Sequence, residues 1–591
     1  MTIPTWQDSA ARLIAVAAGR ESAETVIRGG TVALVQTGEI LPWQIALAAG
    51  RIAYLGPDAS HCIGPDTEVV EWDGLVIPGL VDAHMHVESG MLTPAEFARA
   101  VLPHGTTSMF VDPHEIANVL GLSGVRMMHD EAAMQPANML VQMPSCAPSA
   151  PGLETTGHEI TPDDVAEAMS WPGIVGLGEM MNFPGVVNAD PKMLAEMAAT
   201  MAAGKTVGGH YASPDLGPDF HAYAAGGPAD DHEGTREEDA VARARQGMAA
   251  MLRLGSAWYD VKAQITAVTE RGLDPSLFVL CTDDCHSGTL VNDGHMDRVL
   301  RHAIECGAAP IVALRMATLN AARHFGMERE IGQIAPGRRA DLVLTRTLED
   351  MRAERVMAAG AWVAKDGVCE AVCPHLDWPS EVRGTVRLGK RLAAGDFALP
   401  APAGATAVTA RVIGVVENQA PTEALTAELP VQDGHVGLTG DVAHIALVER
   451  HRGTGGVTNG FVSGFGYAGS MAMASTVAHD SHHMIVVGTD RDAMAKAAMS
   501  LEGGGGVTVW KDGAEIARVD LPIAGLMSDR PAAEVAEAAQ GIVAAMEACG
   551  CTLNNAYMQH SLLALVVIPA LRISDVGLID VTRFERVEVL A

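Results

Sequence analysis

Short apolar strands alternate with helical stretches from Leu75 onward, and this rhythm limits the folds open to the chain. Strand-like runs such as 75–84 and 173–180 are separated by helix-like runs such as 94–105 and 237–252. Roughly six to eight such units over about 270 residues predict a parallel sheet that closes into a (β/α)8 TIM-type barrel. The expected fold class is therefore α/β.

The regions on either side of the barrel have a different pattern. Residues 1–73 contain short β-type runs broken by Gly and Pro, and the β-type pattern returns after the barrel, which spans 74–345. We expect 1–73 and the return segment 346–397 to build one small β-sandwich domain. A Pro/Gly/Ala-rich stretch, 398–407, is typical of a linker. Mixed strands and helices then predict a separate C-terminal α+β domain over 408–591.

The charge balance argues against several classes of partner. The chain has 40 Lys and Arg against 72 Asp and Glu, a formal charge of −32. Such acidity repels phosphate backbones and anionic headgroups, so we expect no nucleic-acid and no membrane partner. We find neither an N-terminal signal pattern nor an apolar run of about 18 residues. Nine Cys without paired spacing indicate reduced thiols, so we expect a soluble cytoplasmic protein.

Two histidines stand two residues apart where an apolar strand ends. They are His84 and His86 in the segment GLVDAHMH. Side chains at alternate positions of a strand point to the same side, which suits two ligands on one metal ion. An HxH pair alone is weak support, but active sites of (β/α)8 barrels lie at the C-terminal ends of the strands.

Later strands of the predicted barrel also end in metal-ligand residue types, namely Glu179, His210, His232 and the pair Asp283 and Asp284. Each of them alone could be a helix cap or a polar loop residue. Because strand ends meet at one mouth of a barrel, we expect the side chains to converge. Mixed nitrogen and oxygen donors suit one or two divalent first-row ions, and a bridging carboxylate can hold two.

Longer motifs carry a family resemblance. The segments HMHVESGMLTP, VDPHEIANVLG, GLGEMMNFPGV, TDDCH and IAPGRRADLVL, and GFVSGFGYAGS past the barrel, resemble the bacterial adenine deaminases of the metal-dependent amidohydrolase superfamily. The resemblance covers nearly the whole chain. It implies deamination of adenine to hypoxanthine and ammonia with two ions, Mn(II) or Fe(II), with Zn(II) as a further option. It also implies a homo-oligomer, a dimer or larger.

The resemblance assigns roles by position. It implies that His84, His86 and Asp283 hold one ion, that His210 and His232 hold the other, and that Glu179 bridges them.

A deaminase also needs proton carriers beside its metal ions. A metal ion supplies hydroxide at neutral pH for attack at C6 of the purine, and Asp283 is positioned to accept the proton. The leaving amine needs a second acid, for which we choose Glu115, with His114 orienting it. Alternatively, Glu115 simply caps the following helix.

Further residues are expected at the substrate or near it. We predict substrate contacts from four residues, Glu88, Ser89, Tyr211 and Asp284. The cluster His479, His482 and His483 is expected to close the site or to serve structure, because it lies outside the barrel sequence.

Other functions remain open. The loop after His210, YASPDLGP, departs from the family's pattern, so a related aminopurine or another N-heterocycle is an alternative substrate. A cyclic-amide hydrolase of the dihydroorotase or hydantoinase kind would need a cationic clamp, and only Arg236 and Arg298 stand near the expected ligands. A non-enzymatic metal-binding scaffold would require missing ligands, whereas all six positions are filled.

Overall fold

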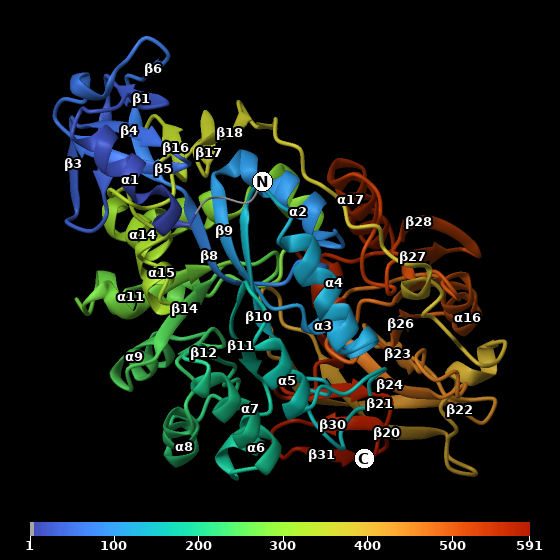
Figure 1. Ribbon diagram of the computed structural model, residues 1–591. Coiled ribbons are helices and arrows are strands. Elements are labelled where there is room, and N and C mark those ends of the chain that lie inside the picture. Colours follow the sequence, from blue (N-terminus) through green and yellow to red (C-terminus); the bar gives the residue numbers. More distant parts are fainter. Residues whose placement is uncertain (1–4) are drawn as a thin grey trace.

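The computed structural model describes residues 5–591, and a closed barrel of parallel strands lies at its centre (Figure 1). Five strands form one sheet and three form a second, all with parallel register. The sheets join where the Ala229 N–H lies 2.8 Å from the Val207 carbonyl oxygen and the Asp283 N–H lies 3.0 Å from that of His84. This closure confirms the predicted (β/α)8 fold class. The strands are β8 (Leu80–Met85), β9 (Thr106–Val111), β10 (Asn138–Met143), β11 (Ile174–Met180), β12 (Thr206–Gly209), β13 (Asp230–Asp231), β14 (Ala249–Arg253) and β15 (Phe278–Cys281).

Apolar residues fill the interior of the barrel. Val81 and Ala83 alternate along β8 and share one buried cluster with Phe110 and Met251. Phe325 closes the N-terminal end, where its ring stacks on Phe110 with centroids 3.7 Å apart. Polar side chains that could carry chemistry are therefore found at the C-terminal end of the barrel. The main helices around the barrel are α2 (Pro94–Val101), α3 (His114–Leu120), α4 (Leu122–Ala132), α5 (Pro162–Ala168), α7 (Pro191–Ala202), α8 (Pro218–Gly226), α9 (Glu237–Arg245), α12 (Ser287–Asn292), α13 (Met296–Glu305), α14 (Pro310–Met316) and α15 (Leu319–His324).

One helix-like run in the sequence is partly a strand. The pattern predicts a helix over 237–252, but α9 ends at Arg245 and residues 249–253 form β14. Gly247 has a φ of 81°, a left-handed conformation that favours glycine and ends the helix. The apolar run after it is therefore free to extend as a barrel strand.

Two sheets pack together into a small β-domain beside the barrel. Their orders are β5-β4-β1-β6 and β19-β18-β17-β16-β7-β2-β3, and one core cluster joins Ile45 of the first to Val76 and Leu342 of the second. Strands β7 and β16 fall inside the range 74–345 expected for the barrel, yet they pair antiparallel here. The strands are β1 (Thr25–Arg28), β2 (Thr31–Leu34), β3 (Glu39–Leu41), β4 (Gln44–Ala48), β5 (Arg51–Gly56), β6 (Glu68–Glu71), β7 (Leu75–Pro78), β16 (Leu342–Thr345), β17 (Arg355–Ala358), β18 (Ala361–Lys365) and β19 (Val368–Cys369).

The C-terminal region has a nine-stranded sheet, ordered β22-β21-β20-β24-β23-β26-β25-β27-β28, and a three-stranded sheet, β29-β30-β31. Val386 and Phe397 pack in one cluster with Met494 of α16, so the later part of the segment 346–397 lies on this region. The elements are β20 (Ala407–Gly414), β21 (Glu423–Gln432), β22 (His435–Val436), β23 (Ala443–Val448), β24 (Val457–Ser463), β25 (Met471–Ser475), β26 (Met484–Gly488), α16 (Arg491–Ser500), β27 (Gly506–Lys511), β28 (Ala514–Asp520), α17 (Ala532–Ala548), α18 (Ala556–Ser561), β29 (Leu571–Ser574), β30 (Gly577–Asp580) and β31 (Glu585–Val587).

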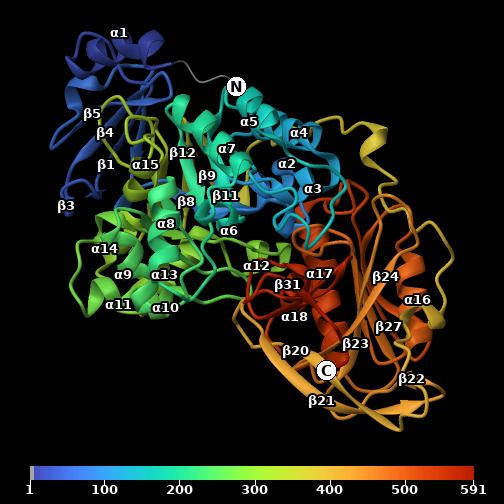
Figure 2. The ribbon, with the colours of Figure 1, turned by 90° about the horizontal axis from the view of Figure 1, so that it is seen from below.

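This C-terminal region packs against the loops at the mouth of the barrel, with α17 and α18 on the side of α12 (Figure 2). The Ser528 N–H lies 2.9 Å from the Met91 carbonyl oxygen, and the Ala532 N–H lies 2.8 Å from Glu96 Oε2. Within residues 5–591, no helix combines the length and apolar character needed to cross a bilayer.

Candidate metal centre

Two histidines and an aspartate converge at the end of β8. His84 and His86 project from the end of this strand, and Asp283 follows β15, its neighbour in the closed barrel. Asp283 Oδ1 lies 3.2 Å from His86 Nε2 and 3.9 Å from His84 Nε2. The backbone of Asp283 is left-handed, with a φ of 59°, at the point where the chain leaves the strand. The sequence prediction that these three side chains meet agrees with their placement.

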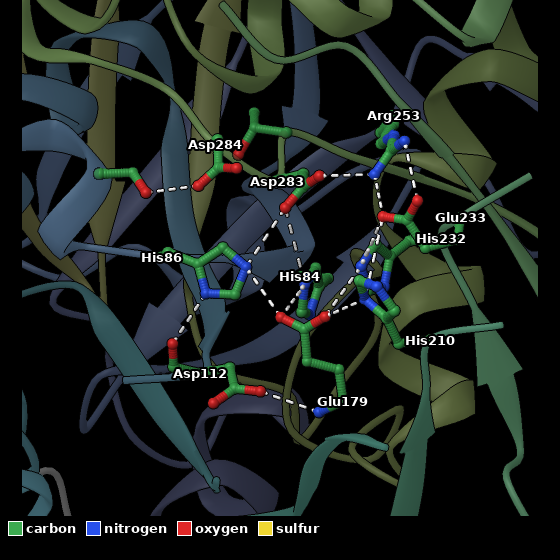
Figure 3. A network of polar contacts seen from close by, with 12 residues as sticks. His84, His86, Asp112, Glu179, His210, His232, Glu233, Arg253, Asp283 and Asp284 are labelled. Atoms are coloured by element: carbon green, nitrogen blue, oxygen red, sulfur yellow. Dashed lines mark hydrogen bonds and ion pairs between the residues drawn. The ribbon is translucent and has the colours of Figure 1, made fainter. Parts of the chain in front are cut away.

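Glu179, at the end of β11, lies between two pairs of histidines (Figure 3). Its Oε1 is 3.2 Å from His86 Nε2 and 3.6 Å from His84 Nε2. Its Oε2 is 3.2 Å from His232 Nε2 and contacts His210 Nδ1. One carboxylate therefore faces both halves of the expected ligand set, the arrangement that a bridge between two ions requires.

The donors fit metal ions by their chemistry as well as their position. His84 Nε2 is buried and has no hydrogen-bond partner, whereas His210 faces Glu179 through Nδ1. Burial would raise the pKa of Glu179, but His232 and His210 outweigh it and hold that pKa well below its usual value. The pKa of Asp283 is likewise lowered, because His86 and Arg253 outweigh its burial. Ionised carboxylates and orphaned imidazole nitrogens are suited to divalent ions.

Buried residues hold these side chains in place. Asp112 Oδ2 accepts a hydrogen bond from the Glu179 N–H at 2.8 Å, and its carbonyl oxygen accepts one from His86 Nδ1 at 2.9 Å. The latter bond directs His86 Nε2 toward the centre. Sequence reasoning assigned no role to Asp112, although its place at the end of β9 was a signal that could have found it.

An arginine at the centre corrects the sequence analysis, which placed only Arg236 and Arg298 near the ligands. Arg253 ends β14 and is 1% exposed, and its Nη1 donates to Asp283 Oδ2 at 2.9 Å. The same guanidinium contacts Glu233 and, at 2.7 Å, Asp260. The sequence analysis missed Arg253 because it predicted a helix up to residue 252. Only a strand brings Arg253 to the mouth of the barrel.

The centre opens into a small cavity that the barrel and the C-terminal region line together. The C-terminal region contributes Ala420, His479, Asp480, Leu562, Leu565 and Ile568. His479 faces the cavity with Asp480, which agrees with the expectation that the cluster of His479 closes the site. Tertiary docking brings these residues there, and no local sequence pattern predicts it.

Arg572 holds the apolar part of this wall. It is 1% exposed, and its guanidinium donates to the carbonyl oxygens of Leu562 and Ile568 at 2.9 Å each and of Ala420 at 2.6 Å. Two wall segments, 562–568 and the one at Ala420, thus share one buried cation. Because no carboxylate pairs with it in these contacts, burial lowers the pKa of Arg572 to about 9.

The expected acid Glu115 and the expected substrate residues Ser89 and Asp284 form a connected set. Ser89 Oγ lies 2.8 Å from Glu115 Oε1 and also contacts Asp284 Oδ1. A hydroxyl has one proton to donate, so hydrogen bonds to both carboxyls require a proton on one of them. Asp284 lines the cavity and burial raises its pKa, whereas Glu115 lies behind it. His114 also lines the cavity, with Nδ1 3.3 Å from Glu179 Oε1.

Two expected substrate residues lie elsewhere. Tyr211 follows His210 and points the other way, as neighbouring residues of an extended chain do. Its ring packs against Phe183, with centroids 4.9 Å apart, and its hydroxyl donates to the Asp215 carbonyl oxygen. Glu88 Oε1 accepts a hydrogen bond from the Ile116 N–H at 3.3 Å and does not line the cavity. Both residues support neighbouring loops instead of facing a substrate.

Comparisons with known proteins agree with this geometry. A family model described as the amidohydrolase family matches residues 75–363, and one described as the adenine deaminase C-terminal domain matches residues 419–585. The chain is 72% identical to an adenine deaminase of Ruegeria pomeroyi, over 100% of this chain and 99% of the relative. It is 63% identical to adenine deaminase 3 of Rhizobium meliloti, over 99% of each chain. It is 47% identical to an adenine deaminase of Moorella thermoacetica, over 98% of this chain and 97% of the relative.

A (β/α)8 barrel with buried His, Glu and Asp donors at its C-terminal mouth defines the metal-dependent hydrolases of the amidohydrolase type. The high sequence identity with these relatives over the full length identifies one family within this class. The chain belongs to the adenine deaminase family. The resemblance found in the sequence motifs is thereby confirmed.

Proposed function

We propose that this protein catalyses the hydrolytic deamination of adenine to hypoxanthine and ammonia, with two divalent ions at the Glu179 centre. The position of Glu179 between two histidine pairs supports the metal pair, and the relatives named adenine deaminase support the substrate. Both nitrogen and oxygen donors are present, a mixture that suits Mn(II) or Fe(II), with Zn(II) as the alternative. By analogy with the family we further propose a cytoplasmic homo-oligomer.

In this proposal the ligands divide as the family's pattern implies. His84, His86 and Asp283 would hold one ion, His210 and His232 would hold the other, and Glu179 would serve both. When bound, the ions would supply hydroxide from water at neutral pH. Asp283 then acts as proton acceptor, because Arg253 fixes its Oδ2 while Oδ1 faces the centre.

The second acid belongs to the set of Glu115, Ser89 and Asp284. Ser89 contacts both carboxyls, so one proton is shared along the set, and Asp284 presents this set to the cavity. We assign Asp284 to donate a hydrogen bond to ring N1, or a proton to the leaving amine, and Glu115 to resupply it through Ser89. This refines the expectation that Glu115 itself meets the substrate.

The surroundings of the cavity support adenine over the rival substrates. A cyclic-amide substrate with a carboxylate needs a free cation, whereas the Arg253 guanidinium contacts Glu233, Asp260 and Asp283. The altered loop after His210 presents Tyr211 away from the cavity, so this departure does not reshape the base pocket. Apolar wall residues such as Leu562 and Ile568 suit the faces of a flat heteroaromatic ring.

The test is to strip the protein of metal, reload it with Mn(II) and supply adenine. Release of ammonia with the absorbance change from adenine to hypoxanthine is expected, while dihydroorotate should remain intact. Asp283→Asn should abolish turnover. If the Mn(II)-loaded protein leaves adenine unchanged but deaminates another aminopurine, the assigned substrate is wrong.

A further inference from the structure

A second set of metal-ligand side chains lies between the barrel and the C-terminal region. His114 begins α3 of the barrel, whereas His479 and Asp480 follow β25 in the C-terminal region. Asp480 Oδ1 is 3.2 Å from His114 Nε2 and 3.6 Å from His479 Nδ1. One donor atom from each of the three lies within 4.8 Å of the other two. We call these residues the interdomain triad.

The spacing within the triad matches that of the Glu179 centre. There the same kinds of atom, imidazole nitrogen and carboxylate oxygen, are separated by 3.2 to 3.9 Å. Ligands about 2.1 Å from one ion are separated by about 3 Å or more from each other. The spacing of the interdomain triad therefore suits an ion no less than the spacing of the Glu179 centre does.

The partners of His114 also favour a cation. Its Nδ1 faces Glu179 Oε1 at 3.3 Å and its Nε2 faces Asp480. Two carboxylates therefore meet at one buried imidazole, and a cation beside Asp480 would offset their charge.

Burial makes unmet polar groups in this cluster costly. His114 and His479 are 2% exposed, and Asp480 is 0% exposed. Asp480 Oδ2 and His479 Nε2 have no hydrogen-bond partner, and Glu115 Oε1 adds a further carboxylate oxygen 3.9 Å from His479 Nδ1. Buried carboxylates are normally paired or coordinate metals.

We propose that His114, His479 and Asp480 bind a further divalent cation, separate from the pair at Glu179, which fastens the C-terminal region to the mouth of the barrel. The imidazole and carboxylate donors suit Mn(II), Fe(II) or Zn(II). Because the site takes one ligand from α3 and two from the segment after β25, its occupancy couples the docking of the two regions to metal. The proposal concerns ion binding and does not depend on the identity of the substrate.

The test counts ions per protomer in the full chain. Protein reloaded with Mn(II) and passed through gel filtration is analysed by elemental mass spectrometry, as wild type, His479→Gln and Asp480→Asn. His444→Gln is the matched control, because His444 is a buried histidine on β23 that packs against Phe461. We expect about one ion fewer in the two triad variants than in the wild type and the control. An equal count in the triad variants and the wild type would overturn the proposal.

A measurement on the wild type alone guards against variants that fail to fold. Crystals of the Mn(II)-loaded protein should show an anomalous scattering peak among His114, His479 and Asp480 in addition to any at Glu179. If only the Glu179 peaks appear, His114 instead bridges the two carboxylates as an imidazolium and the proposal fails. Adenine turnover measured on the same samples reports separately on the proposed function.

Discussion

Replacing Glu179 with glutamine isolates the contribution of one negative charge at the centre of the site. The amide keeps the shape of the side chain but has no charge to face His86 and His84 on one side and His232 and His210 on the other. Removing one partner from a buried ionic group costs about 3 to 5 kcal/mol. At 1.4 kcal/mol per tenfold change, the affinity for the ions should fall by about 100- to 4,000-fold.

The assay for Glu179→Gln is metal titration monitored by elemental analysis after dialysis, together with adenine turnover. We expect at least one ion fewer per protomer and loss of turnover. Glu196→Gln is the control, because Glu196 is a buried acid on α7 whose carboxyl oxygens have no hydrogen-bond partner and whose pKa burial raises to about 8. Unchanged ion affinity in Glu179→Gln would refute the bridging role.

Three further results are expected. Arg253→Met leaves Asp283 and Glu233 without their cation, so urea unfolding of the metal-free protein should show a loss of about 3 to 5 kcal/mol. Arg572→Met frees the wall segments, so KM for adenine should rise about tenfold with a smaller change in kcat; equal effects on both would contradict a wall role. Burial lowers the pKa of His232, but Glu179 raises it more strongly, to about 9. A metal ion must then displace the proton of His232, so the affinity for the ion should weaken about tenfold for each pH unit below 9. An affinity that does not change with pH would contradict this.

The sequence predicted which side chains meet at the centre because most of them lie at the end of an apolar strand. His84, His86, Glu179, His210 and Asp283 are fixed by a local rule, since the C-terminal ends of barrel strands meet at one mouth. The barrel itself follows from the same alternation of elements. Their assigned roles as metal ligands stay a prediction for the metal experiments to test.

What the sequence did not predict depends on contacts between distant segments. Arg253 was hidden because the short strand β14 resembles a continuation of α9, and only the φ of Gly247 separates them. His114 and Asp480 are 366 residues apart, and no periodicity predicts that they meet. Tyr211 was placed in the pocket by adjacency to His210, whereas the alternation of the extended chain turns it away.

The wall formed by Leu562, Leu565 and Ile568 has a consequence for biosynthesis. A polypeptide emerges from the ribosome N-terminus first, at about 5 to 20 residues per second, and domains tend to fold in that order. The barrel and its acid-rich mouth are thus made long before the segment that roofs them. During that interval the side chains around Glu179 are not yet covered by the wall, so capture of the proposed ions can precede completion of the cavity.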